Sequence, residues 1–219
     1  MTRRTLVILT AVIAVSVFAA AGMWFTGKDA DKKAGATVAD ASLLVRPHSP
    51  SFGPRSAPVT IVEFFDPACE PCRAFYPLVK KIMAEFPGQV RLVLRYTPLH
   101  QGSDEVVRLL EIARLQQKFE PVLEAILQAQ PQWASHGAPR IEKAWEVAEA
   151  AGLDLAQTRN ALMSPEVSAV LEQGILDSKA AGATKTPTFI VNGKHLPSFG
   201  AQQLYDLVES EVRAAAGGK

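Results

Sequence analysis

The residues best suited to chemistry in this chain are Cys69 and Cys72, the only two cysteines among 219 residues. They are separated by Glu70 and Pro71. The thiolate is the form of cysteine that attacks a disulfide, and thiols at this Cys-X-X-Cys spacing have pKa values of roughly 3.5 to 7.5, against about 8.5 for a free thiol. The spacing therefore predicts a redox-active pair, with Cys69 as the exposed nucleophile and Cys72 as the resolving thiol.

The elements predicted around the pair place Cys69 at the start of a helix. Residues 59–65 are mostly β-branched and aromatic, which is typical of a buried strand. After the cysteines, apolar residues recur at spacings of three and four as far as Phe86, which predicts one face of a helix. The unpaired N–H groups and the dipole at a helix start stabilise negative charge, so this position favours a thiolate.

Two other interpretations of the cysteine pair compete with redox chemistry. A structural zinc site needs four Cys or His ligands, but the chain has no second cysteine pair and no His-x3-5-His spacing among its four histidines. A purely structural disulfide between residues 69 and 72 would close a very short loop and contribute little chain entropy. Redox activity is the favoured interpretation, and no metal ligand is assigned.

The sequence around the cysteines resembles the active-site helix of the thioredoxin superfamily. Residues 69–77 are CEPCRAFYP, in which Pro71 gives the Cys-x-Pro-Cys form and Pro77 stands where the family's helix is kinked by proline. Glu63, six residues before the first cysteine, stands where the family carries a buried acid. The resemblance implies that Glu63 exchanges a proton with Cys72 during the reaction.

The family's second landmark is a loop with a cis-proline that faces the disulfide. Thr186 and Pro187, which precede the strand-like residues 188–191, match this loop. The resemblance implies a cis bond between them, and it implies that they position a partner chain by strand-like pairing. Glu70 and Pro71, beside the nucleophile, are expected to contact the same partner.

From residue 49 to the C-terminus, the chain resembles the exported, DsbA-like branch of the superfamily. This resemblance implies an α/β thioredoxin fold, in which a central mixed sheet is flanked by helices and carries an inserted all-helical subdomain. The expected organisation is an anchor or signal segment at residues 1–27, a linker at 28–54, and a DsbA-like thioredoxin domain at 55–216 with its helical insertion at about 102–182.

Local sequence patterns agree with this organisation. Residues 89–96 alternate in polarity like a strand, so they form a βαβ unit with the first strand and the active-site helix. Residues 102–182 carry helix signals and no strand signal. Asn192-Gly193 favours a hairpin turn. We expect His100 to have a capping or loop role and Trp133 to fill the core.

Two departures from the family pattern bear on the chemistry. DsbA-like oxidases often have a histidine between the cysteines, whereas this chain has Glu70, and a carboxylate beside Cys69 disfavours the thiolate. A raised thiol pKa usually goes with a weaker oxidant, an effect that Arg73 is expected to offset in part. Thioredoxins also pair the buried acid with a lysine on the following strand, where this chain has Leu94, with Arg95 on the opposite face.

Residues 1–27 have the pattern of an export or anchoring segment. Arg3 and Arg4 precede an uncharged run at residues 5–27, which is long enough to span a bilayer. Small residues around Ala21 also offer a cleavage site, so the alternatives are an uncleaved membrane anchor, which we favour, and a removed signal peptide. Either way the domain is expected in the cell envelope, on the extracytoplasmic side, where disulfide chemistry is permitted.

The expected function is that of an enzyme, a protein thiol-disulfide oxidoreductase. Its partners would be thiol- or disulfide-containing exported proteins and a membrane partner that resets the cysteine pair. No metal or organic cofactor is needed, because the disulfide itself carries the two electrons. The net charge of +1 gives no sign of a nucleic-acid-binding surface.

Several alternatives stay open. The direction of electron flow is that of an oxidase, an isomerase or a reductase, and the oligomeric state is undetermined. Outside the enzyme class, the chain would be a thioredoxin-fold binding or chaperone module without redox turnover, or a copper-handling protein that uses the two thiolates, which suit Cu(I).

Overall fold

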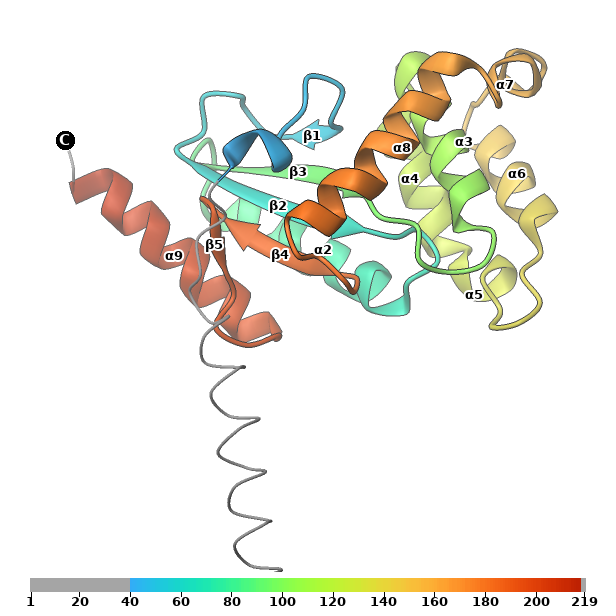
Figure 1. Ribbon diagram of the computed structural model, residues 1–219. Helices are drawn as coiled ribbons and strands as arrows, with labels where there is room; N and C mark the ends of the chain where they lie inside the picture. The colour runs from blue at the N-terminus through green and yellow to red at the C-terminus, as the bar shows by residue number, and fades with distance from the viewer. Residues whose placement is uncertain (1–39, 218–219) are drawn as a thin grey trace, which may run out of the picture.

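The computed structural model describes residues 40–217, which are organised around one five-stranded sheet (Figure 1). The strands are β1 (Ser51–Phe52), β2 (Val59–Phe65), β3 (Val90–Tyr96), β4 (Thr188–Val191) and β5 (Lys194–His195). Their order in the sheet is β1-β3-β2-β4-β5. Strands β2 and β3 are parallel, and the other neighbouring pairs are antiparallel. This mixed sheet, flanked by helices, confirms the fold class expected from the sequence.

The longer helices are arranged in two groups (Figure 1). Helices α2 (Glu70–Glu85) and α9 (Ala201–Gly217) pack against the sheet and against each other. Between β3 and β4 the chain forms a helical block, which corresponds to the expected insertion. The block consists of α3 (Ser103–Leu115), α4 (Phe119–Gln128), α5 (Gln130–Trp133), α6 (Ile141–Ala150), α7 (Leu155–Ala161) and α8 (Pro165–Ala180).

The central strand β2 is buried on both of its faces. Ile61 and Phe65 belong to the large core that includes α2, α9 and most of the helical block. Val62 and Phe64 face a smaller second core on the other side of the sheet. A strand covered on both faces is apolar along its whole length, which explains the uninterrupted run in the sequence. Glu63 is the exception, and by alternation it points to the same side as Ile61 and Phe65.

Helix α8 approaches the sheet closely enough that one position requires glycine. A Cβ atom placed on Gly174 would lie 2.6 Å from the carbonyl oxygen of Tyr96 in β3. Real Cβ atoms do not approach an oxygen so closely, so a side chain here would push the helix away from the strand. Gly174 therefore sets the separation between the helical block and the end of β3.

Part of the segment predicted as a linker at residues 28–54 is instead packed on the domain. Over residues 40–54 it contains a short 3-10 helix, η1 (Ala41–Leu43), and strand β1, which pairs with β3. The side chain of Leu44 is buried in the second core. The linker prediction is thus wrong for these residues, because their composition does not reveal contacts made with distant parts of the chain.

Charged side chains also hold this N-terminal segment in place. The guanidinium group of Arg46 donates hydrogen bonds of 2.9 and 2.7 Å to the carboxylate of Asp177 in α8. The same carboxylate accepts a bond from Arg95 of β3, and Arg95 also donates to Ser49 at 2.9 Å. As expected, Arg95 lies on the face of β3 opposite to Leu94. We call Arg46, Arg95 and Asp177 the second-face ion cluster.

Residues 1–39 lie outside the described part of the chain, and with them the anchor or signal segment predicted at 1–27. Within residues 40–217, no helix combines the length and the hydropathy that crossing a bilayer requires. The membrane anchor therefore stays a prediction from the sequence.

Candidate redox site

The two cysteines lie at the start of α2, as predicted. Cys69 is the N-cap residue of the helix, Cys72 lies in its first turn, and Pro71 occupies an early position that proline tolerates because the N–H there has no helical partner. The structure corrects one expectation: Cys69 is only 2% exposed. The thiol donates a 3.3 Å hydrogen bond to the carbonyl oxygen of Thr186, so the loop before β4 covers the Cys69 sulfur.

The pKa values of the two thiols shift in opposite directions. The pKa of Cys69 is lowered from 9.0 to about 6, first by the hydrogen bond from the Cys72 thiol, against the opposing effect of burial, with a hydrogen bond from the Thr186 side chain, and not its carbonyl group, acting in the lowering direction. Burial is also the main reason that the pKa of Cys72 is raised, and donating a hydrogen bond to Cys69 raises it further. Near neutral pH the reduced pair is therefore a thiolate at Cys69 and a thiol at Cys72.

Glu63 places a carboxyl group beneath the cysteine pair. It is 1% exposed, and its Oε1 atom has no hydrogen-bond partner among the described residues. Its neighbours across the sheet are Leu94 of β3 and Phe189 of β4. Burial, and secondly the negative charge of Cys69, raise its pKa to about 8, whereas a hydrogen bond with Cys72 lowers it. Glu63 thus carries a proton at neutral pH, in contact with the Cys72 thiol.

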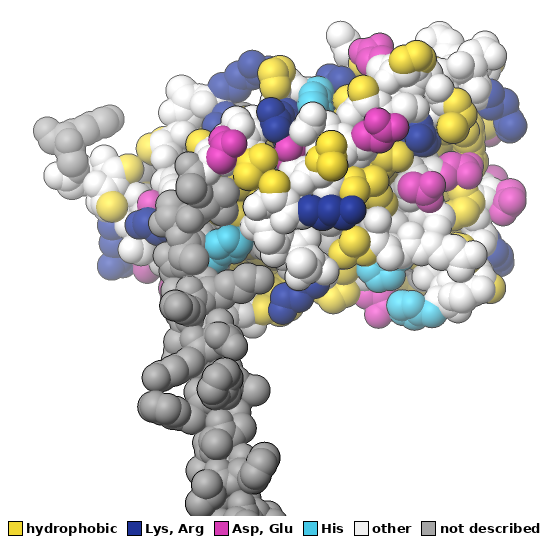
Figure 2. Space-filling model, viewed as in Figure 1, with side chains coloured by type: hydrophobic (Ala, Val, Ile, Leu, Met, Phe, Trp, Pro, Cys, Tyr) yellow, Lys and Arg dark blue, Asp and Glu magenta, His cyan; other side chains and the backbone are white. Residues whose placement is uncertain are grey.

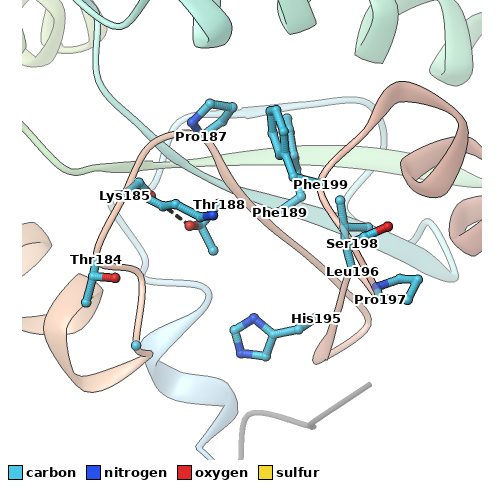
Figure 3. A pocket seen from close by; sticks show the side chains of 11 residues that line it. Thr184, Lys185, Pro187, Thr188, Phe189, His195, Leu196, Pro197, Ser198 and Phe199 are labelled. Carbon is cyan, nitrogen blue, oxygen red and sulfur yellow. Dashed lines mark hydrogen bonds between the residues drawn. The ribbon is translucent and has the colours of Figure 1, made fainter. Parts of the chain in front are cut away.

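The loop that faces the cysteines contains the expected cis peptide bond between Thr186 and Pro187. Beside this loop is a cavity of about 200 Å³, whose lining includes Lys185, Pro187, Phe189 and Phe199 (Figure 3). The Phe75 ring of α2 lies 5.3 Å from the Phe189 ring and 4.9 Å from the Phe199 ring, measured between centroids. Phe199 is 50% exposed, so this aromatic cluster presents an apolar surface next to the redox site.

Asp66 is a site residue to which the sequence patterns assign no role beyond opening a turn. It is fully buried three residues before Cys69, and one carboxylate oxygen accepts a 2.8 Å hydrogen bond from the backbone N–H of Ala68. The other oxygen accepts bonds from the backbone N–H groups of Leu99 and His100, at 2.6 and 3.0 Å. It also lies 2.7 Å from Nδ1 of His100. Asp66 therefore joins the cysteine loop to the loop after β3, where His100 has the expected loop role.

The exposed rim of the site carries charges that are only weakly paired. Glu70 is 67% exposed at its side chain, and the histidine nearest to its carboxylate, His136, lies 3.9 Å away and is also exposed. Exposed ion pairs of this kind contribute little to the stability of the fold, because water screens the two charges. Acidic and basic side chains are interspersed over the face shown in Figure 2, and no continuous basic surface is seen on that face.

Two further features concern Trp133 and the side chains that could bind a metal ion. Trp133 is fully buried and donates a 2.9 Å hydrogen bond from Nε1 to the carbonyl oxygen of Ile126, so it fills the core as predicted. Within residues 40–217, no group of three or more His, Cys, Asp or Glu side chains is arranged to hold a metal ion.

Comparison with known proteins identifies what this arrangement is similar to. The thioredoxin family matches residues 46–209 of the chain. The crystal structure of a thioredoxin-like oxidoreductase from Silicibacter pomeroyi DSS-3 is 32% identical, with a TM-score of 0.66, over 78% of this chain and 95% of that one. Oxidised BdbD from Bacillus subtilis has a TM-score of 0.69 at 20% identity, over 83% of this chain and 98% of that one, which shows a shared fold.

A curated relative of a different kind also matches. The Na(+)/H(+) antiporter NhaA of Herminiimonas arsenicoxydans is 30% identical over 208 residues, which is 92% of this chain and 32% of that protein. The chain thus spans about a third of the length of this relative. The similarity between the two proteins is therefore confined to one part of the antiporter sequence.

Proposed function

The chain belongs to the thioredoxin family, and we propose that it is a member of the DsbA-like branch that exchanges disulfides with exported proteins through Cys69 and Cys72. The general redox role follows from the family and from the thioredoxin-like oxidoreductase that is 32% identical to it. The observation that carries the specific proposal is the contrast between the two thiols, one with a lowered pKa and one with a raised pKa.

The proposed reaction begins with the oxidised pair. A substrate thiolate attacks the sulfur of Cys69, the bond between Cys69 and Cys72 breaks, and Cys72 leaves with the electron pair. Glu63 is protonated below about pH 8 and donates its proton to the departing Cys72 sulfur. The product of this step is a mixed disulfide between the substrate and Cys69.

The second step releases the product. A second substrate thiolate attacks the substrate sulfur of the mixed disulfide, and Cys69 leaves as a thiolate. The substrate has then lost two electrons and gained a disulfide, and the enzyme's pair is reduced. Because a thiol with a low pKa is a good leaving group, the pKa of about 6 at Cys69 favours donation of disulfides.

The position of Glu70 supports the same direction. The sequence predicts that its carboxylate weakens the oxidant by disfavouring the Cys69 thiolate. With 67% of its side chain exposed, the charge is screened by water, and Glu70 is not among the main influences on the pKa of Cys69. We infer that disulfide donation, rather than reduction, is the physiological direction.

The proposal places the domain in the cell envelope. Its support is the sequence of residues 1–27, which has the pattern of an anchor or signal segment, together with the oxidising environment that disulfide donation requires. The partners in this proposal are exported proteins that contain thiols, and a membrane redox partner that reoxidises the reduced pair.

The test is oxidation of a reduced, unfolded dithiol protein by the oxidised full-length chain. We expect the wild type to transfer one disulfide per molecule, and Cys69→Ser to transfer none. Cys72→Ser, which lacks the resolving thiol, should accumulate a mixed disulfide with the substrate through Cys69. If Cys69→Ser retained the wild-type effect on substrate folding, the protein would be a binding module and the redox proposal would fail.

A further inference from the structure

Gln130, the first residue of α5, connects the helical block to the cysteine loop. It is 1% exposed. Its Nε2 group donates hydrogen bonds of 2.7 Å to the carbonyl oxygen of Pro67 and 3.0 Å to that of Cys69. Its Oε1 atom accepts a 2.9 Å bond from Nε of Arg73. This orientation of the amide is required, because carbonyl groups only accept hydrogen bonds and a guanidinium group only donates them.

The two carbonyl groups that Gln130 contacts lie close to the nucleophile in the chain. The oxygen of Cys69 belongs to the same residue as the reactive sulfur, and it also accepts the backbone N–H of Arg73 at 3.2 Å. The negative end of a carbonyl dipole near a sulfur opposes the formation of a thiolate. A donor bound to that oxygen draws negative charge away from the sulfur and weakens the opposition.

Arg73 strengthens this donor. A hydrogen bond from a guanidinium group to Oε1 polarises the amide, and polarised groups in a buried chain of hydrogen bonds donate more strongly. Gln130 is sequestered from water, so the interaction acts in an environment of low dielectric constant. Arg73 is thereby connected to the peptide groups around Cys69 through one side chain that lies about sixty residues away in the sequence.

We propose that Gln130 is a positioning residue that transmits the positive charge of Arg73 to the carbonyl groups of Pro67 and Cys69, which favours the Cys69 thiolate. The inference rests on the proposed function in assigning Cys69 as the nucleophile. It assigns the helical block an indirect part in the chemistry, because the amide that binds the two carbonyl groups comes from α5.

The test is a pH titration of the reduced full-length protein, following the thiolate by absorbance at 240 nm and by the rate of alkylation with iodoacetamide. Gln130→Met, which keeps the volume but removes the amide, should raise the Cys69 midpoint by about half a pH unit, equivalent to about a threefold loss of thiolate below the midpoint. Gln132→Met is the matched control on the exposed side of α5, and it should leave the midpoint unchanged.

A double-mutant comparison separates transmission from a purely structural role. Arg73→Met alone should raise the midpoint by less than Gln130→Met, and adding it to Gln130→Met should raise the midpoint no further. Additive shifts would mean that Arg73 acts on Cys69 directly, and the proposal would be wrong. An unchanged midpoint in a folded Gln130→Met protein would also overturn it.

Two further comparisons separate a failure to fold from an effect on the Cys69 thiol, and separate this inference from the proposed function. If Gln130→Met does not fold, Arg73→Met remains a test, since Arg73 lies at the partly exposed end of the chain of bonds, and an unchanged midpoint there overturns the proposal. The titration needs no substrate. If the variants show the expected shifts but the wild-type protein transfers no disulfide, the proposed function is refuted and this inference is supported.

Discussion

Glu63 lies directly opposite Leu94 in the parallel register of β2 and β3, so its carboxyl group has an aliphatic neighbour where the family resemblance pointed to a lysine. The nearest arginine along the strand, Arg95, binds Asp177 on the other face of the sheet. Without a cation beside it, the carboxyl group is governed by burial and by the adjacent thiols. Glu63 therefore acts as a protonated acid near neutral pH, and not as half of an ion pair.

This burial makes the stability of the protein depend on pH through Glu63. Its pKa is raised from 4.5 in the unfolded chain to about 8, so the native state holds a proton that the unfolded state releases between these values. The free energy of unfolding should fall as pH rises from about 5 to about 8, by on the order of 3–4 kcal/mol, and then level off. Glu63→Gln should remove this dependence.

The measurement is urea unfolding at several pH values in a background that carries Cys69→Ser and Cys72→Ser, so that no thiol titrates. Because the Cys69 charge is the second cause of the raised pKa and burial the first, the fall in this background should be smaller and keep its direction. Glu142→Gln, at an exposed position on α6, is the control and should leave the wild-type profile in place. A pH profile that is equally steep with and without Glu63 would show that another group is responsible.

The low pKa of Cys69 should depend on the hydrogen-bonding capacity of residue 72. The bond from Cys72 is the largest cause of the lowering to about 6, so Cys72→Ala should move the midpoint of the Cys69 thiolate upward by at least about one pH unit. Cys72→Ser keeps a donor and should stay closer to the wild type. Absorbance at 240 nm, followed from acidic to alkaline pH, measures both, and equal midpoints for the two variants would contradict this explanation.

The second-face ion cluster should be sensitive to the loss of its acid. Asp177→Ala leaves Arg95 buried without a counter-charge, which should lower the free energy of unfolding by about 3–5 kcal/mol. Arg46→Met should cost less, because the Arg46 side chain is 27% exposed and Asp177 keeps its bond to Arg95. Removal of the exposed Arg213–Glu209 pair is the control, with an expected cost of about 1 kcal/mol or less. Urea unfolding compares the three variants.

Gly174 should not tolerate even the smallest side chain. A Cβ atom there meets the Tyr96 carbonyl oxygen, so Gly174→Ala should destabilise the fold by about 1–3 kcal/mol by pushing α8 away from β3. At Gly217, near the end of α9, an added Cβ atom would meet nothing within 4 Å, and Gly217→Ala should be close to neutral. Thermal unfolding of the two variants decides the matter, and a stable Gly174→Ala protein would mean that the helix shifts at little cost.

The features that can be predicted from the sequence are those whose evidence lies in neighbouring residues. The cysteine spacing, the strand before it and the apolar face of α2 are all contained in residues 59–86. The cis bond before Pro187 is also predictable, because the loop matches a family landmark. These local patterns are enough to place Cys69 and Cys72 at a helix start and Glu63 on the buried strand before it.

The features that escape prediction are contacts between distant residues. Gln130 and Cys69 are separated by 61 positions, and Arg46 and Asp177 by 131. A glutamine or an arginine in isolation has no periodicity that reveals its partner. The same limit explains the error over the exposure of Cys69, since the covering loop comes from the other end of the domain. Only the folded arrangement identifies these residues as parts of one site.

The brevity of β1 and β5 has a consequence for a protein that handles unfolded chains. A long, uncovered sheet edge is a template on which extended polypeptides stack and aggregate. Here β1 occupies the middle of the outer side of β3, and the opposite edge is the two-residue strand β5. Non-native partners thus find little backbone to extend into a growing sheet, and we expect the short edges to disfavour coaggregation with the unfolded polypeptides that the domain is proposed to oxidise.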